Sequence, residues 1–180
     1  QVKFLVPKGD GYWLSKWGLD NFCEFDWWQR LCVAGVNFTF LPAHHWSQRS
    51  LFDQNKSLWG SWMVEGNSKK VYFAGDTAYG SHFKEIQKCF SKIDIALMPV
   101  GPCEPERWMC KSHMNAEDAC KAFLELDAIN FVPMHWGTFH FGTDNFDTPI
   151  VRLEKWWQQN KLLLKIHSLH VLKFGRSSKF

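Results

Sequence analysis

The chain has 180 residues, 46% of them hydrophobic, and a formal net charge of +3, which suits one folded domain with a buried core. Its lysines and arginines are scattered, which argues against a nucleic-acid partner. No apolar run reaches the roughly 18 residues that a membrane span needs, and no signal-peptide pattern opens the chain. We expect a single domain over residues 1–180 of a cytoplasmic protein.

The N-terminal half reads as a series of short strands. A strand is expected over residues 1–7, a short helix over residues 11–17 and a further strand over residues 22–25. Two hairpins follow, the first joining residues 27–33 to 36–41 through Ala34-Gly35, and the second joining residues 57–65 to 70–74 through Gly66-Asn67-Ser68. The polar stretch over residues 44–55 is expected to be a loop.

Helices and strands alternate in the C-terminal half. Helices are expected over residues 81–90, 115–126 with Asn115 as the N-cap, and 147–159, and strands over residues 93–100, 129–134 and 162–174. The last strand is expected as one long element or two shorter ones. Strands first, then alternation, predict a layered α/β architecture with helices covering one sheet.

Three of the expected strands end at a side chain that can bind a metal. Residues 41–46 contain His44 and His45, residues 71–77 contain Asp76, and residues 131–138 contain His135. One histidine at a strand end is more often a packed or solvated residue, but three such ends together favour a site. Imidazole nitrogen and carboxylate oxygen both suit zinc or iron. The pattern therefore predicts that His45, Asp76 and His135 converge on a metal.

Aromatic residues are unusually frequent, with 11 Trp and 16 Phe. We expect the pairs Trp27-Trp28 and Trp156-Trp157 to pack in the core, and the alternative is that one ring of each pair lies exposed on an apolar surface. The six cysteines form no CxxC pair, so we expect reduced thiols.

The segments around these candidate ligands resemble the metallo-β-lactamase superfamily, and most closely its N-acylphosphatidylethanolamine-hydrolysing phospholipase D branch. The segments that carry the resemblance are HWSQRSLFD at residues 45–53, NKSLWGSW at 55–62, FAGDT at 73–77 and HWGTF at 135–139. The resemblance implies a metallo-β-lactamase-like αββα sandwich of mixed α/β class, here incomplete and lacking its N-terminal portion.

The resemblance also implies roles for particular residues. His45 matches a ligand of the first zinc ion, Asp76 the carboxylate that bridges two zinc ions, and His135 a ligand of the second. His113 matches a histidine beside the reacting phosphate, so Asp76 and His113 are the expected catalytic residues, with a metal-bound hydroxide as the nucleophile. Trp46 is expected to contact substrate, and Thr77 to support the Asp76 carboxylate with a hydrogen bond.

One family signature, His-x-His-x-Asp-His, has no counterpart among these residues. In the family it lies upstream of the segment that corresponds to residues 2–7, and it supplies about half of the metal ligands. The zinc ligand set expected here is therefore incomplete. Either the N-terminal segment is missing, or it lies on another chain, or the site has been lost, and we expect the chain alone to be inactive.

Three functions stay open at this point. The first is a zinc-dependent phosphodiesterase of the phospholipase D type, acting in lipid metabolism on a phospholipid or a small phosphodiester. The second is a metal-free fragment or binding protein that keeps the fold, and the third is a metallo-lactonase of sugar phosphates. Peripheral membrane contact, a homodimer and a missing N-terminal segment are the partners that the sequence leaves open.

Overall fold

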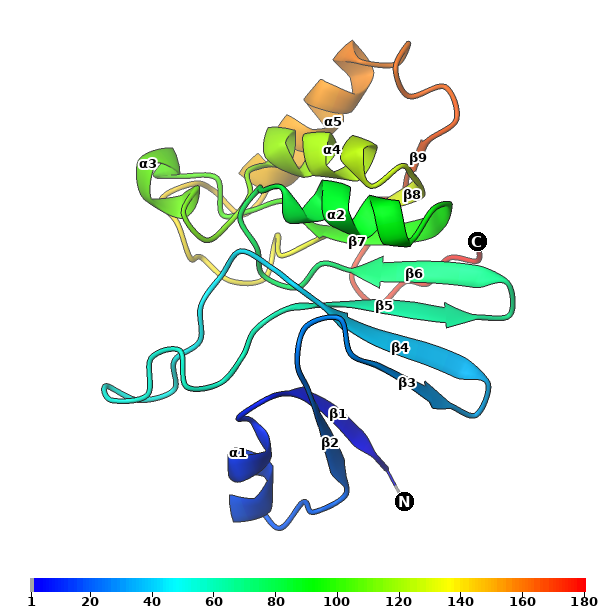
Figure 1. Cartoon of the computed structure of the whole chain (residues 1–180). Helices are drawn as coiled ribbons and strands as arrows, with labels where there is room; N and C mark the ends of the chain where they lie inside the picture. The colour runs from blue at the N-terminus through cyan, green and yellow to red at the C-terminus, as the bar shows by residue number, and fades with distance from the viewer. Residues whose placement is uncertain (1) are drawn as a thin grey trace.

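The computed structural model describes residues 2–180, and its elements follow the order that the sequence predicts, with strands first and alternation later (Figure 1). The first half contains β1 (Phe4–Pro7), α1 (Gly11–Lys16), β2 (Phe22–Phe25), β3 (Arg30–Val33), β4 (Val36–Leu41), β5 (Ser61–Gly66) and β6 (Lys69–Phe73). The second half contains α2 (His82–Cys89), β7 (Ile93–Pro99), α3 (Glu106–Met109), α4 (Ala116–Glu125), β8 (Ala128–Met134), α5 (Thr148–Gln159) and β9 (Ser168–Leu169).

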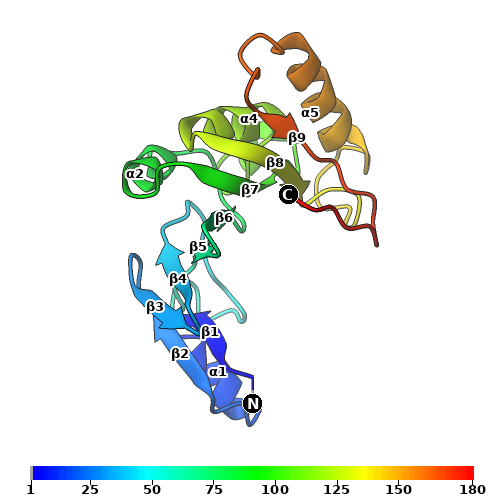
Figure 2. The same ribbon diagram turned by 90° about the vertical axis from the view of Figure 1, so that its right-hand side faces the viewer.

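The strands form two sheets. The larger has the order β3-β4-β5-β6-β7-β8-β9, and the smaller is the parallel pair β1-β2. Neighbouring strands from β3 to β6 are antiparallel, whereas those from β6 to β9 are parallel. Parallel strands need a crossover, which α2 and α4 supply between β6, β7 and β8. The small sheet and α1 lie at the opposite end of the molecule from α5 (Figures 1 and 2).

Both predicted hairpins are present, and their turns explain the register. Ala34 and Gly35 have φ of 51° and 80°, and Asn67 and Ser68 have φ of 50° and 60°. Positive φ at both central residues is the geometry of a two-residue turn whose twist matches the flanking strands. The second turn therefore closes at Asn67-Ser68, and the predicted turn residue Gly66 belongs to β5.

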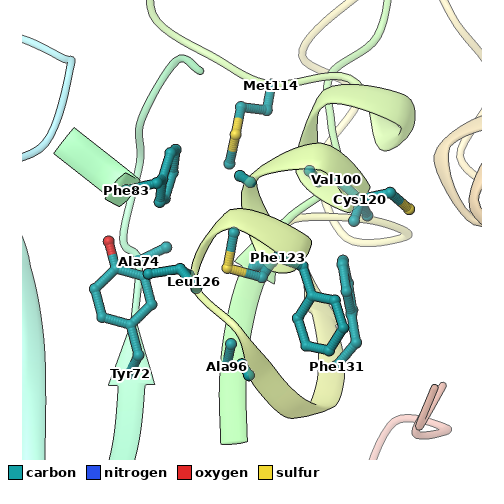
Figure 3. Close-up of a cluster of buried hydrophobic side chains, with 14 of the residues drawn as sticks. Tyr72, Ala74, Phe83, Ala96, Val100, Met114, Cys120, Phe123, Leu126 and Phe131 are labelled. Atoms are coloured by element: carbon teal, nitrogen blue, oxygen red, sulfur yellow. The ribbon is translucent and has the colours of Figure 1, made fainter. Parts of the chain in front are cut away.

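The core lies between the parallel part of the large sheet and the helices α2 and α4 (Figure 3). Phe123 of α4 packs against Phe131 of β8, Phe83 of α2 lies beside Tyr72 of β6, and Leu126, the C-cap residue of α4, belongs to the same cluster. The predicted N-cap of α4 is confirmed, because the Asn115 side chain accepts a hydrogen bond from the backbone N–H of Asp118. Capping and apolar burial together fix α4 on the sheet.

Three strand predictions were wrong in extent. The strand expected over residues 57–65 begins only at Ser61. The strand expected over residues 27–33 begins only at Arg30, because Trp28 has φ of 70°, which β-structure does not allow. Of the strand expected over residues 162–174, only Ser168–Leu169 pairs with β8. The apolar residues before it belong to the turn that leads from the end of α5 back to the sheet edge, and Leu162 and Leu163 are exposed there.

The tryptophan pairs differ from each other. Trp28 is exposed while Trp27 donates its indole N–H to the carbonyl of Trp59 at 2.6 Å. Trp156 and Trp157 lie on α5, not on a strand, and both pack partly buried against the core. All six cysteines are free, as predicted. Within residues 2–180, none of the helices is both long and apolar enough to cross a membrane.

Candidate metal centre

The sheet brings the predicted ligands to one edge. Asp76 lies in the loop after β6 and His135 directly follows β8, and because β6, β7 and β8 are parallel their carboxyl ends meet at the same edge. His45 comes from the loop after β4, and His113 comes from the segment between α3 and α4. Four residues that are far apart in the sequence therefore lie together.

Asp76 occupies the middle of this group. Its Oδ1 lies 3.0 Å from Nδ1 of His135 and 3.6 Å from Nδ1 of His113. One potential ligand atom each from His45, Asp76 and His113 lie within 4.8 Å of one another. The compact set of three donors thus includes His113, which the sequence placed beside the substrate, while His135 contacts the group through the carboxylate.

The imidazole of His45 is held in one orientation. Its Nδ1 lies 2.8 Å from the backbone carbonyl of Trp46, and its ring stacks on the Trp46 indole at an interplanar angle of 4°. A carbonyl can only accept, so the proton sits on Nδ1 and the lone pair on Nε2. That Nε2 is buried and has no hydrogen-bond partner among the described residues. The Trp46 side chain itself is exposed beside the site.

These donors fit a metal ion. Nε2 of His45 and Nδ1 of His113 are both buried without a hydrogen-bond partner within residues 2–180, although the second lies 3.6 Å from the Asp76 carboxylate. Such atoms cost stability unless a further ligand satisfies them. Two imidazoles and one carboxylate are the usual ligands of zinc and of other first-row metals. The site would hold one such ion through His45, Asp76 and His113, with His135 beside the carboxylate.

The Asp76 carboxylate is kept ionised by its neighbours. The imidazole of His113, and then that of His135, hold the pKa of Asp76 well below its usual range, although partial burial opposes them. A carboxylate that stays charged is the form in which a metal is bound.

Backbone conformation at two positions brings the ligands close. Gly75 has φ of 64°, and a Cβ there would lie 2.9 Å from the carbonyl oxygen of Gly60. Only glycine fits so near a neighbouring strand, so Asp76 can enter the site beside β5. His135 itself has φ of 59°, a conformation that is uncommon outside glycine and that concentrates at functional sites.

Thr77 supports the site differently from the prediction. Its hydroxyl accepts from the backbone N–H of His44 at 2.9 Å and donates to the carbonyl of Ala78 at 2.9 Å. Within residues 2–180 it makes no hydrogen bond to the Asp76 carboxylate, because its side chain turns toward the loop after β4. Thr77 thereby joins the segment of His44 and His45 to the segment of Asp76.

Replacing Thr77 with Val should destabilise the fold by about 1–3 kcal/mol, because the backbone N–H of His44 would lose its acceptor in a partly buried place. Thr77→Ser keeps the hydroxyl and is the matched control, with a much smaller loss. Urea unfolding of both variants measures the difference. Equal stability of the two variants would show that the hydrogen bond to His44 contributes nothing.

A second histidine next to this loop is buried and neutral. Nε2 of His82 lies 3.3 Å from the Thr77 hydroxyl. Burial, and to a smaller extent the charge of His44, lowers the pKa of His82 from 6.5 to about 4, while Glu125 opposes both effects. The unfolded chain therefore binds a proton near pH 6.5 that the folded chain takes up only near pH 4.

The protein should lose up to about 3 kcal/mol of stability through His82 as the pH falls from 6.5 to 4. Above pH 6.5 the residue is neutral in both states and contributes no pH dependence. Unfolding free energies of wild type and His82→Gln at several pH values check this, since only their difference isolates His82 from the carboxylates. A difference that stays constant between pH 7 and pH 4 would contradict the buried neutral state.

A pocket of about 350 Å³ opens beside the ligands. Asp76, His113 and His135 form its polar end, and the loop after β8 forms an aromatic wall from Trp136, Phe139, Phe141 and Phe146. The Phe141 ring meets the His113 ring at 6.1 Å between centroids. Sequence reasoning missed this wall, although the phenylalanines that closely follow His135 are its visible signal.

The pocket wall is fixed by a second carboxylate. Asp144 accepts from the backbone N–H of Cys103 and of Glu104, both at 3.2 Å, and the carbonyl of Glu104 accepts from Thr143 at 3.0 Å. The loops after β7 and β8 are thereby joined. These hydrogen bonds hold in place the two loops that line the pocket at this edge of the sheet.

The mixed α/β fold, with histidines gathered around one carboxylate at an edge of the sheet, is typical of the metallo-β-lactamase class of proteins. Residues 1–136 match the family described as "Beta-lactamase superfamily domain". The chain therefore belongs to the metallo-β-lactamase superfamily.

Similar proteins include two phospholipases. The chain is 37% identical over 158 residues to the mitochondrial N-acyl-phosphatidylethanolamine-hydrolyzing phospholipase D of Saccharomyces cerevisiae, covering 84% of this chain and 34% of the yeast protein. It is 34% identical over 157 residues to N-acyl-phosphatidylethanolamine-hydrolyzing phospholipase D 1 of Caenorhabditis elegans, covering 81% of this chain and 44% of the relative. The chain thus spans less than half the length of these relatives.

A solved structure shares the fold. Igni18, a metallo hydrolase from Ignicoccus hospitalis, superposes with a TM-score of 0.71 at 20% identity and covers 97% of this chain and 67% of its own. The predicted α/β metallo-β-lactamase fold is confirmed.

Proposed function

We propose that this protein is a metal-dependent hydrolase that cleaves a phosphodiester, of the type of the N-acyl-phosphatidylethanolamine-hydrolyzing phospholipases D. The observation that carries the proposal is Asp76, whose Oδ1 lies 3.0 Å from His135 and 3.6 Å from His113 at the polar end of the pocket. Similarity to the yeast and worm phospholipases supports the phosphodiester, and zinc is the metal that we propose.

The side chains of the candidate metal centre would have different roles. His45 through Nε2, His113 through Nδ1 and Asp76 through its carboxylate would hold the ion, which when bound would supply Lewis acidity and a lowered pKa for water. Trp46 orients His45 by accepting the Nδ1 proton on its carbonyl. His135, beside Asp76, would place a proton donor or a further metal ligand next to the reacting group.

The pocket limits the substrates. Its polar end would take an anionic phosphodiester, while the aromatic wall after β8 would bury an apolar substituent of the same molecule. A substrate with both parts, such as a phospholipid, matches this division better than a fully polar one. Trp46, exposed beside His45, would extend the contact with the substrate outside the pocket.

A substrate panel tests the proposal. The full-length protein, loaded in turn with zinc, manganese or iron, is assayed with N-acylphosphatidylethanolamine, bis(p-nitrophenyl) phosphate and a sugar-phosphate lactone. We expect hydrolysis of the two phosphodiesters, with preference for the lipid. Turnover of the lactone alone would replace the proposal with a metallo-lactonase.

Zinc titration of the 180-residue chain tests the metal-free alternative by calorimetry. The donor set predicts binding of one ion, lost on replacing His45 with Ala. If neither this chain nor the full-length protein binds zinc, manganese or iron, the protein is a binding module that keeps only the fold.

A further inference from the structure

The most exposed apolar side chains of the described residues form a neighbouring pair. Leu51 and Phe52 are 86% and 85% exposed at the tip of the loop between β4 and β5. In Figure 1 this loop projects from the left side of the molecule, the side on which α3 also lies. Two large apolar residues held together in water are unfavourable unless they contact something.

Hydrogen bonds within the loop between β4 and β5 hold its backbone in one conformation. Asp53 Oδ1 accepts from the backbone N–H of Arg49 at 3.0 Å and of Ser50 at 2.7 Å. Asn55 and Ser47 exchange hydrogen bonds of 2.7 Å and 3.2 Å across its base. The backbone is thereby fixed with Leu51 and Phe52 pointing outward, so that contact through them needs little further ordering.

The helix α1 continues this surface with cationic and aromatic groups. The Arg49 guanidinium lies 6.0 Å from the Trp13 ring and 5.8 Å from the Trp17 ring. The Lys16 ammonium lies 4.4 Å from the Tyr12 ring. Tyr12 and Trp17 are exposed. Aromatic rings beside lysine and arginine, next to a protruding apolar pair, are the side chains that settle at a bilayer interface.

The charges favour an anionic partner. Between Ser47 and Ser57 the chain carries Arg49 and Lys56 against the single acid Asp53, whose carboxylate is turned back onto backbone amides. The helix α1 carries Lys16 and no acidic residue. Within these two segments the surface therefore combines an apolar tip with three basic residues against one acid, while Asp10 and Asp20 flank α1.

We propose that Leu51 and Phe52, with Lys16, Arg49 and the exposed rings of α1, form a docking surface for an anionic phospholipid membrane. Leu51 and Phe52 would insert among the acyl chains while Lys16 and Arg49 contact the lipid phosphates. The loop begins directly after His45 and Trp46, so docking would bring the candidate metal centre close to the membrane. The inference does not depend on the hydrolase proposal, because it concerns binding without turnover.

Co-sedimentation of the 180-residue chain with vesicles tests the surface. One set of vesicles contains phosphatidylcholine and phosphatidylserine, and the other contains phosphatidylcholine alone. We expect stronger binding to the anionic vesicles, weakened by added salt. The double substitution Leu51→Ser and Phe52→Ser should lower the partition coefficient at least about 100-fold, because each buried side chain contributes more than one tenfold step.

Two further variants make the test specific. Leu162→Ser with Leu163→Ser removes a pair that is 83% and 64% exposed beyond α5 and should leave vesicle binding unchanged. Lys16→Gln with Arg49→Gln should cost about fivefold per charge on anionic vesicles and little on neutral ones. These charge variants keep the test decisive if the apolar variant does not fold.

Three results would overturn the docking surface. One is absence of wild-type binding to anionic vesicles, and another is equal loss in the variant beyond α5. The third is a Leu51 and Phe52 variant that changes the oligomeric state in light scattering while vesicle binding persists, since the tip would then contact a second copy of the chain. Neither vesicle contains an N-acylated lipid, so a catalytically inactive chain can still support the inference.

Discussion

Replacing Asp76 with Asn should lower the affinity of the chain for a divalent metal at least about 100-fold, the upper end of what loss of a supporting residue costs. Asp76 Oδ1 lies against both His113 and His135, and its charge is kept by the lowered pKa of the carboxyl. An amide keeps the shape but loses the charge. Calorimetric titration with zinc measures the change.

The control for this variant is Asp94→Asn. Asp94 lies near the start of β7, away from the carboxyl edge of the sheet, and pairs with Lys69 at 2.9 Å. Its replacement should leave zinc affinity within about twofold, since surface pairs contribute little. In the full-length protein, Asp76→Asn should also cost more activity than His113→Ala. Equal losses in activity would argue that Asp76 does not link the two histidines.

Replacing Phe123 with Ala should destabilise the protein by about 3–5 kcal/mol, the usual cost of deleting a buried phenyl ring. Phe123 is fully buried, and its ring lies 5.0 Å from Phe131, 5.9 Å from Trp157 and 5.3 Å from His167. The ring thus joins α4 to β8, as Figure 3 shows, and also to α5 and the segment before β9. Urea unfolding followed by circular dichroism measures the loss.

Val151→Ala on α5 is the matched surface control, because Val151 is 54% exposed and its truncation should change stability by less than about 0.5 kcal/mol. A loss below about 1 kcal/mol for Phe123→Ala would mean that the core between α4 and β8 collapses around the cavity. The same variant should leave the donor atoms of Asp76 and His113 in place. Zinc titration of the folded variant checks whether the core substitution leaves the metal affinity unchanged.

The strands and helices that were predicted well are those with strong local signals. The turn residues Ala34-Gly35 set one hairpin, and Asn115 with its first-turn acids set the start of α4. Where prediction was wrong, the local signal was misleading. The apolar run after Lys161 looks like a strand, but most of it is a connection that returns from α5 to the sheet, and β8 pairs only with Ser168 and Leu169.

The candidate site was predicted residue by residue, but not its internal arrangement. His45, Asp76, His113 and His135 were all identified from the chain, and they lie together in the structure. That His113 joins His45 and Asp76 in the compact donor set, and that Thr77 bonds the backbone of His44, depends on how the segments before α4 and after β4 pack. Such contacts between distant segments leave no periodic signal in the sequence.

By itself, the sequence indicated which residues could bind a metal and which elements end beside them, because turn preferences, caps and apolar periodicity act over a few neighbouring residues. Only the tertiary structure decided how those ends meet. The parallel order of β6, β7 and β8 puts Asp76 and His135 at one edge, and the aromatic wall and the exposed Leu51-Phe52 tip arise from packing. Packing depends on the whole chain at once, which is why the aromatic wall and the exposed tip could not be predicted from local pattern, and why the convergence of Asp76 and His135 was predicted without its geometry.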